Sequence, residues 1–436
     1  MILKKSQTFE LSSQRILGIL DTEFNHNNGF VGRDITAKSI SKNALADEQF
    51  AQPGRSALQE IIVKRCTIDH QQSQRQSFAI TSCDLAGCYD RIIHTAAALA
   101  MLRIGVSHKR IKSMFQTIQK MIHRIRTVYG DSKITYGGEL GNWENWPMGV
   151  LQGNAAGPAI WSVLSSVIFK ILHKRGFSSN ITSAISKQLF TLIGFAYVDD
   201  CDLFQVGNNP LEVLASMQSL INSWGNLMEV TGGSIRADKS WWYLIDYVWK
   251  RGKWVGNDSC MDMDLIATDS NGELVSLKRL RCDQAAEMLG IWLAPDGNKQ
   301  KVIRVLKKKA LEWGSKVRLG NPSPREAWTA LHTNISARLK YPVPACTLTE
   351  LECKSIMSPA IRAALPKAGI VSTMETAMRD GPISSLGCGV LSLYHFMGTS
   401  RTAFLVEHLA HDTPLGIIFR INIEDLVVDS GKFGKL

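Results

Sequence analysis

A pair of adjacent aspartates, Asp199 and Asp200, lies between two short apolar runs near the middle of the chain, and this pattern limits the possible folds more than any other feature. The apolar runs are residues 192–198 and 202–206. Runs of this length around a short polar segment predict a β-hairpin, here with carboxylates at the turn of residues 199–201. Residues 77–84 predict another strand, which ends in Asp84. If these strands pair, the three carboxylates converge on one point.

Carboxylates that converge from rigid strands are the protein part of a two-metal site. Two divalent ions about 3.5–4 Å apart clamp the attacking and leaving oxygens of a phosphoryl displacement. Magnesium takes oxygen ligands, and a few carboxylates suffice when water and substrate phosphates complete its coordination. Acidic residues also end strands and form turns without any catalytic role, so neither segment establishes the site when it is taken alone.

The rest of the pattern predicts an α+β centre followed by a helical C-terminal part. Residues 1–76 are mixed and polar, with helix-like stretches at 37–46 and 55–66. Helices are predicted at residues 89–104, 106–128, 159–172 (with Pro158 in the first turn), 211–230 and from about 299 onward. A hairpin or elaborated loop is predicted at 129–146, and strands at 240–248 and 287–293 around a polar segment, 252–272.

The positive charge of the chain is unevenly distributed. The formal net charge is +11, and residues 299–340 hold eleven Lys or Arg against two acids, a net charge of +9. A local cationic surface suits a polyanion such as a nucleic-acid backbone. A solvated helix face is the alternative explanation. An anionic membrane fits less well, because no strongly apolar face accompanies the charges.

Several classes of protein are disfavoured by the sequence. It contains no apolar run of 18 residues, and its start lacks the apolar stretch of a secretory signal. The nine cysteines are scattered and form no Cys-x-x-Cys pair, so neither a disulfide framework nor a zinc site is predicted. We therefore expect a reduced, intracellular protein, cytoplasmic or nuclear, that is not secreted.

Five segments, in order along the chain, resemble the polymerase motifs of reverse transcriptases, and their order and spacing carry the resemblance. They are Asp84-Leu-Ala-Gly-Cys-Tyr-Asp90 for motif A, Gly149-Val-Leu-Gln-Gly-Asn-Ala-Ala-Gly-Pro158 for motif B, Tyr197-Val-Asp-Asp200 for motif C, Ala237-Asp-Lys-Ser240 for motif D and Leu289-Gly-Ile-Trp-Leu293 for the primer-grip hairpin. Residues 48–56 are similar to a fingers segment of retroelement enzymes, and 341–344 to the thumb region of polymerases from non-LTR-like retroelements.

The resemblance implies a right-hand polymerase with fingers, a palm built on an antiparallel sheet, and a helical thumb. It assigns the fingers and the start of the palm to residues 1–83, the palm with motifs A to E to 84–298 (105–148 partly fingers), and the basic thumb or C-terminal region to 299–436. The implied reaction is RNA-directed DNA synthesis with two Mg²⁺ ions, or Mn²⁺ in their place. The implied partners are an RNA template, a DNA primer and dNTPs, but no membrane. No endonuclease or RNase H motif is evident, so such activity would come from a separate chain or a longer polyprotein.

The resemblance also assigns roles around the metal ions. Asp84 and Asp199 would ligate both ions, and the backbone carbonyl of Leu85 would be a further ligand. Asp200 would support the site electrostatically. Lys239 would protonate the leaving pyrophosphate as a general acid, and the alternative is an exposed lysine with no role.

Other matched positions would contact the nucleotide. Tyr89 matches the steric gate that excludes a ribose 2′-hydroxyl, although a packing role is the alternative. Gln152 and Gly153 would approach the incoming nucleotide. Arg55, with Lys64, would contact triphosphate or template, and a plain helix is the alternative there.

Some matched positions depart from the family or carry a structural role. Asn154 and Gly157 stand where the family commonly has serine, which puts the fit of the nucleotide pocket in question. Asp90 is expected to cap or orient the helix start beside Tyr89. Trp241, Trp242 and Trp249 are expected to pack in the core rather than stack on bases.

The basic C-terminal stretch is expected to hold the nucleic-acid backbone through one helix face made by Arg304, Lys307, Lys308 and Lys316. Two other functions stay open. An RNA-dependent RNA polymerase is disfavoured by Tyr89, because such enzymes tend to carry a polar residue at that position. A catalytically inactive RNA-binding scaffold is disfavoured by the intact aspartates, because three crowded like charges are unfavourable without a cation.

Overall fold

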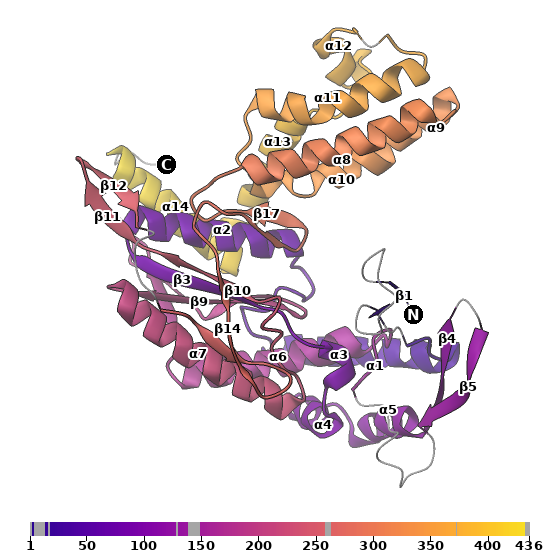
Figure 1. Ribbon diagram of the computed structural model, residues 1–436, viewed down its shortest axis with the longest axis vertical. Helices are drawn as coiled ribbons and strands as arrows, with labels where there is room; N and C mark the ends of the chain where they lie inside the picture. Colours follow the sequence, from indigo (N-terminus) through magenta and orange to yellow (C-terminus); the bar gives the residue numbers. More distant parts are fainter. Residues whose placement is uncertain are drawn as a thin grey trace.

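The computed structural model describes residues 2–3, 14–15, 18–127, 130–137, 149–257, 263–371 and 373–431, and within them the chain is a mixture of helices and β-strands (Figure 1). A five-stranded sheet with the order β15-β10-β3-β9-β8 lies at its centre. Its strands are β3 (Ser77–Cys83), β8 (Gly194–Tyr197), β9 (Asp200–Gly207), β10 (Trp241–Ile245) and β15 (Lys278–Arg279). The predicted α+β centre is therefore present.

The two strands predicted to carry the aspartates are neighbours in this sheet. β3 pairs antiparallel with β9, with Ser77 opposite Gly207 and Cys83 opposite Cys201. β9 also pairs antiparallel with β8, which makes the predicted hairpin. On its other side β3 pairs antiparallel with β10, and only β15 joins in parallel, alongside β10.

Alternate residues of β3 and β9 face two separate cores, as the period of two in a strand requires. On one face Ala79 and Leu203 pack with helices α6 (Gly157–Lys174) and α7 (Pro210–Thr231). On the other face Phe78 and Phe204 pack with α2 (Ala57–Gln74) and with helices from the C-terminal part. Because helices cover both faces, the strands read as nearly continuous apolar runs in the sequence.

Helices and one hairpin extend the end of the sheet at which β3 ends. They are α1 (Thr22–Ser41), α3 (Cys88–Arg91), α4 (His94–Arg103), α5 (His108–Lys120), β4 (Ile122–Thr127) and β5 (Gly130–Gly137). The predicted helix at 89–104 was wrong in one respect: it is broken at Ile92 and Ile93, where the backbone is extended and the Ile93 N–H donates to the carbonyl of Thr231. The predicted helix at 106–128 ends at Lys120, and the following residues, which include the β-branched Ile122, Ile125 and Thr127, form β4. Part of the loop predicted at 129–146 is β5, and residues 138–148 lie outside the described residues.

The described residues also form several small two-stranded sheets. They are β1 (Ile2–Leu3) with β2 (Gln14–Arg15), β6 (Ser179–Thr182) with β7 (Leu189–Leu192), β11 (Tyr247–Lys250) with β12 (Lys253–Gly256), β13 (Ile266–Thr268) with β14 (Leu274–Ser276), and β16 (Ala286–Met288) with β17 (Ile291–Leu293). Two predicted single strands were wrong. The stretch at 240–248 is divided between β10 and β11. The one at 287–293 is the β16–β17 hairpin, which turns at Leu289 and Gly290, so the pattern was wrong there while the hairpin expected from the resemblance is present.

The C-terminal part is helical, as predicted. Its elements are α8 (Gln300–Leu319), α9 (Pro324–Ala330), η3 (Leu331–Ile335), α10 (Ser336–Lys340), η4 (Val343–Ala345), α11 (Glu350–Lys367), α12 (Thr376–Asp380), η5 (Ile383–Ser385), α13 (Leu393–His408) and α14 (Pro414–Ser430). The last helix leaves this group and packs along α2, where the buried His70 ring lies 2.6 Å from an Asp425 carboxylate oxygen (Figure 1). Among the residues placed by the structure, no helix is both long and apolar enough to cross a bilayer.

Candidate active site

Asp84, Asp199 and Asp200 lie at one end of the central sheet. Asp84 follows β3 directly, and β9 begins at Asp200. Because Cys83 is opposite Cys201, the next residue of each strand toward this end, Asp84 and Asp200, is also brought side by side. The convergence of these segments was predicted from the sequence. The register of β3 against β9, which produces this convergence, could not be read from the sequence alone.

The turn between β8 and β9 has an unusual backbone. Tyr197 is opposite Asp200, so only Val198 and Asp199 link the strands, and the turn lies one residue earlier than predicted. Val198 has φ +60°, a left-handed conformation that is costly for a β-branched residue. Such a conformation persists only where its surroundings hold it.

Two buried side chains hold this turn. The Val198 N–H donates to Oε1 of Gln49 at 3.2 Å, and the Val198 carbonyl accepts from Nε1 of Trp161 on α6. Gln49 is fully buried and Trp161 is 2% exposed. The backbone N–H and the carbonyl of Val198 are thus both bound to buried partners. This fixes the direction of the neighbouring Asp199 side chain. Neither residue was predicted to have a functional role, because the partners of a turn depend on tertiary contacts.

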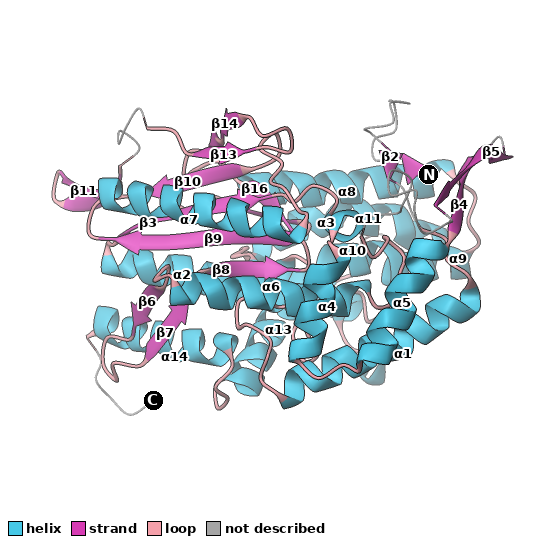
Figure 2. Cartoon of the chain, turned by 90° about the horizontal axis from the view of Figure 1, so that it is seen from below, coloured by secondary structure: helices cyan, strands magenta, loops and turns pink. Residues whose placement is uncertain are grey.

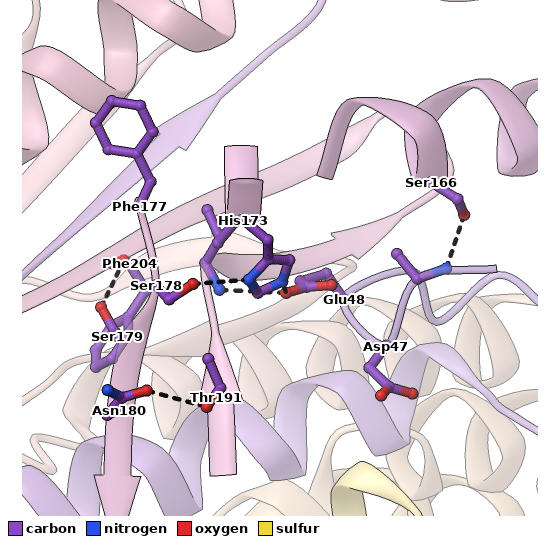
Figure 3. Close-up of polar contacts among 12 residues, drawn as sticks. Asp47, Glu48, Ser166, His173, Phe177, Ser178, Ser179, Asn180, Thr191 and Phe204 are labelled. Atoms are coloured by element: carbon purple, nitrogen blue, oxygen red, sulfur yellow. Dashed lines mark hydrogen bonds and ion pairs between the residues drawn. The ribbon is translucent and has the colours of Figure 1, made fainter. Parts of the chain in front are cut away.

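The segment that carries Gln49 is itself fixed against β8 and α6. The Ala196 N–H donates to the carbonyl of Glu48 at 2.8 Å, and the Phe50 N–H donates to the carbonyl of Ala196 at 2.7 Å. Figure 3 shows the buried Glu48 carboxylate 2.6 Å from Nε2 of His173, whose Nδ1 lies 2.8 Å from the Ser178 hydroxyl. The hydrogen bond that the His173 ring donates to the Glu48 carboxylate raises the pKa of His173. Residues 48–50 therefore act as an extra edge of the sheet behind the turn that carries Asp199.

The electrostatics of the three aspartates are those of crowded like charges. Partial burial is the main cause that raises the pKa of Asp200 to about 6, and the charges of neighbouring aspartates add to it. Those neighbours are Asp199, Asp202 and Asp84. Partial burial also raises the pKa of Asp84, although the Lys239 and Arg236 charges act against it. The arrangement therefore disfavours negative charge unless a cation is present.

Because the pKa of Asp200 is raised, the substitution Asp200→Asn is predicted to change the stability of the folded chain in a pH-dependent way. Because the folded-state pKa of Asp200 is raised, its contribution to stability is greatest below about pH 4 and is lost as the pH rises through about 6. In buffer with a chelator, Asp200→Asn should therefore raise the melting temperature at pH 8 and change it little near pH 4. Thermal unfolding at both pH values checks this, with Glu407→Gln on exposed α13 as the control. An equal shift at both pH values would contradict the electrostatic account.

Residues 234–240 lie against the other side of Asp84. The Asp84 carbonyl accepts from the Arg236 N–H at 2.8 Å, and its N–H donates to the Ser240 hydroxyl at 3.2 Å. Lys239 Nζ lies 3.7 Å from Oδ2 of Asp84, and both side chains are partly exposed. The structure therefore brings the predicted Lys239 into the site, where it partly neutralises a carboxylate.

Leu85 sits where its carbonyl can reach the site. It forms an isolated antiparallel bridge with Ile235, and the hydrogen bonds of that bridge come from the flanking residues Asp84 and Ala86. In this pattern the N–H and C=O of Leu85 itself point to the opposite side of the strand. That is the side on which β9 begins. The backbone therefore fits the predicted role of the Leu85 carbonyl.

Tyr89 packs beside the loop of residues 149–157. Its carbonyl accepts from the Val150 N–H at 2.8 Å, and its ring is half-buried. A Cβ on Gly157 would lie 3.3 Å from Cδ1 of Tyr89, and a Cβ on Gly149, with φ +79°, would lie 2.3 Å from the Tyr89 carbonyl oxygen. The glycine at 157, where the family has serine, thus leaves space for the Tyr89 ring.

Of the two structural roles predicted for Asp90, capping of its own helix is wrong, and orientation of the helix start stays a prediction. The N-cap of α3 is Gly87, which makes no side-chain cap hydrogen bond, and Asp90 Oδ1 accepts from the Gln152 N–H at 3.0 Å. The backbone of Gln152 is therefore held by Asp90 on α3, the helix that follows the strand end carrying Asp84. Its partly buried side chain stays a candidate for nucleotide contact.

Gly153 is required by the protein's own backbone. It has φ +120°, and a Cβ there would lie 2.4 Å from the carbonyl oxygen of Gly18. Asn25 on α1 holds the same loop, because its side chain donates to the Gly153 carbonyl at 3.2 Å and accepts from the Ala155 N–H at 2.8 Å. The buried Asn154 accepts from the Ala156 N–H, as at the start of a helix. The close contact with Gly18 is therefore enough to explain why position 153 is a glycine. Close approach to a nucleotide, the predicted reason, is not needed.

Arg55 and Lys64 differ in their surroundings. Arg55 binds Asp47 through two hydrogen bonds of 2.8 Å and lines a cavity of about 330 Å³ that also includes Tyr197 and Val198. Lys64 is buried, pairs with Asp202 of β9 and lies 3.1 Å from the sulfur of Met288. The predicted contact of Lys64 with triphosphate or template was wrong, because the ammonium group is enclosed beneath the sheet.

The basic residues of α8 are exposed, but they do not share one face. At about 100° per residue, Arg304, Lys307 and Lys308 lie within about 100° of arc, whereas Lys316 lies about 180° from Lys307. Val302, Leu306 and Ala310 form the buried side against the rest of the helical part. A single phosphate-binding face would therefore use Arg304, Lys307 and Lys308 without Lys316.

The three tryptophans that were predicted to pack in the core differ from one another in how deeply they are buried. Trp242 is fully buried and Trp241 is partly buried, but Trp249 is 57% exposed. The prediction for Trp249 was wrong, because this residue lies in β11, which pairs with β12 in a separate two-stranded sheet.

The donor set at the sheet end fits a hard divalent cation in its chemistry. It offers carboxylate and carbonyl oxygens from Asp84, Leu85 and Asp199, which are the ligand types that magnesium prefers. In the part of the chain that the structure describes, no three His, Cys, Asp or Glu side chains are already arranged as a metal site. Carboxylates with pKa values raised by partial burial and by neighbouring negative charges are nevertheless those that a cation would stabilise.

Comparisons with known proteins find only distant likenesses. No protein-family profile matches the chain, and no curated protein matches it. Among solved structures, apo telomerase from Candida tropicalis is 11% identical, with a TM-score of 0.38, over 91% of this chain and 61% of that chain. Telomerase from Candida albicans in complex with the TWJ fragment of telomeric RNA is 12% identical, with a TM-score of 0.34, over 90% and 58%. Apo C. tropicalis telomerase truncated from the C-terminal domain is 13% identical, with a TM-score of 0.34, over 58% and 45%.

The chain thus spans about half the length of the telomerase chains that it matches. TM-scores below 0.5 do not establish a shared fold throughout, so the function is inferred from the geometry of the site itself.

Proposed function

We propose that this chain is a template-directed polymerase of the reverse transcriptase type, which extends a primer 3′-hydroxyl with dNTPs on an RNA template. The observation that carries this proposal is the placement of Asp84, Asp199 and Asp200 at one end of paired strands. The loop that contains Tyr89, Asp90 and Gln152 lies against the same strand end. A fixed carboxylate cluster beside a loop of this kind suits phosphoryl transfer, which depends on positioning and electrostatics.

Each of the chain's own residues at this site would have a distinct role in the proposed reaction. Asp84, Asp199 and the Leu85 carbonyl would hold two Mg²⁺ ions, or Mn²⁺, and these ions would neutralise charge on the attacking and leaving oxygens. Asp200 would add negative potential that favours cation binding. Gln49 and Trp161 would keep the turn at Val198 in place. Lys239, now beside Asp84, would turn toward the pyrophosphate and donate a proton.

The remaining parts of the proposal concern the nucleic acid. Residues 1–83 and part of 105–148 would be fingers, the central sheet with its helices the palm, and the helical part from 299 the thumb. The exposed Arg304, Lys307 and Lys308 would hold the phosphate backbone of a primer–template without reading its sequence. A retroelement of the non-LTR-like kind would be the source, and endonuclease or RNase H activity would belong to another chain.

A primer-extension assay separates this proposal from its alternatives. The purified chain is incubated with Mg²⁺ and a labelled primer on an RNA template, with dNTPs in one reaction and NTPs in another. Extension with dNTPs is the expected result. Extension with NTPs alone would identify an RNA polymerase. Absence of extension while the primer–template is bound would identify an inactive RNA-binding scaffold.

Tyr89→Ala tests the proposed sugar discrimination. If the Tyr89 ring excludes a 2′-hydroxyl, its removal should raise ribonucleotide incorporation relative to deoxynucleotide incorporation by about tenfold or more, because a clash is lost. Single-nucleotide kcat/KM ratios for dNTP and NTP provide the measurement. Tyr89→Phe is the matched control and should keep the wild-type ratio. An unchanged ratio in a Tyr89→Ala variant that still extends primers would show that the ring only packs against Gly157.

A further inference from the structure

The β11–β12 hairpin carries a surface that the proposed catalytic site does not use. Trp249 and Trp254 face each other across the two strands, with ring centroids 5.4 Å apart and an interplanar angle of 74°. They are 57% and 48% exposed. Tryptophan is strongly buried on average, so two exposed neighbours form an uncommon apolar surface.

The charge around these rings is entirely positive within the hairpin. The turn holds Lys250, Arg251 and Lys253, all of them exposed, and residues 247–256 contain no acid. Arg75, at the end of α2, is close enough to lower the pKa of Tyr247 at the base of the hairpin, whose net shift is nevertheless upward because of burial. The hairpin therefore combines flat aromatic faces with a local cationic tip.

The hairpin lies at the far end of the sheet from the aspartates. Trp241 of β10 is opposite Ser82 near Asp84, whereas Ile245 is opposite Phe78, and β11 follows directly. At about 3.3 Å per residue, β10 ends about 20 Å from the carboxylates, and the hairpin begins beyond that point. Figures 1 and 2 both place it at the opposite end of the sheet from α3.

We propose that the β11–β12 hairpin binds single-stranded RNA, whose bases stack on Trp249 and Trp254 while Lys250, Arg251 and Lys253 contact the phosphates. Bases of any identity stack on aromatic rings, and a cationic groove or tip holds the backbone between them. Arginine and lysine at exposed positions beside the rings supply this charge. The choice of RNA over DNA depends on the proposed function, in which an RNA template extends beyond the catalytic site.

The full chain is tested with a ten-residue oligouridine that carries a fluorescent label and, in a second preparation, 4-thiouridine for cross-linking. Trp249→Ala/Trp254→Ala should weaken binding by about tenfold or more, because two stacking platforms are lost. Lys250→Gln/Lys253→Gln leaves the tryptophan pair intact and should lower the slope of log affinity against log salt by about 1.4. Cross-links should map to residues 247–256. Leu351→Ala/Lys354→Gln on exposed α11 is the matched control and should change neither quantity.

Several outcomes would overturn the proposal. Unchanged affinity in both hairpin variants, or cross-links only outside the hairpin, would show that the tryptophans merely stabilise two strands. Equal loss of oligothymidine and oligouridine binding would support the surface but remove the preference for RNA. Binding of the hairpin to anionic phospholipid vesicles, with no effect on RNA, would identify a membrane contact instead. Extension on a minimal template should be normal in these variants, so failure of the polymerase proposal and failure of this one are distinguishable.

Discussion

Asp199→Asn is expected to lower the rate of primer extension by about a thousandfold or more while the chain still folds and binds primer–template. The change removes a proposed metal ligand, and each 1.36 kcal/mol of lost transition-state stabilisation corresponds to about a tenfold loss in rate. The fold should survive because Asp199 is exposed and lies in the two-residue turn that Gln49 and Trp161 hold through Val198. Single-turnover extension at saturating dNTP provides the rate.

The control for this prediction is Asp412→Asn, which removes a surface carboxylate paired with Arg420 and should leave extension unchanged. Extension by Asp199→Asn within tenfold of the wild-type rate would exclude Asp199 as a metal ligand. A variant that loses both extension and its melting transition would report on folding, and Asp199→Glu, which keeps the charge, would then separate the two effects.

Lys64→Met is expected to destabilise the folded chain by about 3–5 kcal/mol. Lys64 and Asp202 form an ion pair in which the side chains are 6% and 3% exposed, so removal of one partner leaves a buried charge uncompensated. The neighbouring Glu60 cannot replace the lost positive charge, and burial, the largest cause, together with the charge of Asp202 raises its pKa well above the usual range. Denaturant unfolding of both proteins gives the free-energy difference.

The double variant Lys64→Met/Asp202→Leu provides the internal control. Replacement of a buried ion pair by apolar residues is often nearly neutral, so the double variant should recover most of the stability lost in Lys64→Met. Lys354→Met, on the exposed face of α11, should cost less than about 1 kcal/mol, since surface ion pairs contribute little. A Lys64→Met loss as small as that of Lys354→Met would show that Lys64 is hydrated, and would reopen its contact with triphosphate.

The elements that depend on local pattern were the ones that sequence could predict. The apolar runs of β3, β8 and β9 and the amphipathic α7 have periods and ends that the sequence displays, including Gly232 at the end of α7. The helix at 89–104 was interrupted because the backbone at Ile93 bonds to Thr231, a residue far away in sequence. Propensity alone cannot report a tertiary contact of this kind.

The same distinction applies to the site. Aspartates at strand ends indicated where charge would gather, but the sequence could not show that Gln49 and Trp161 hold the turn or that Asp90 binds the Gln152 backbone. It also placed Lys64 on the substrate side, because a lysine on a helix gives no signal of a buried aspartate partner on a distant strand. Asp202, with no assigned role in the sequence, is that partner.

The claim on which the polymerase account depends is that Asp84 and Asp199 share a divalent cation, and iron-mediated cleavage tests it most directly. Fe²⁺ bound in place of Mg²⁺ generates hydroxyl radicals with ascorbate and peroxide, and these cut the backbone beside the ion. The account predicts cuts near Asp84 and near Asp199 in the wild-type chain, suppression of both by excess Mg²⁺, and loss of both in Asp199→Asn. Cuts at one segment only, or cuts that persist in Asp199→Asn, would contradict a shared metal site.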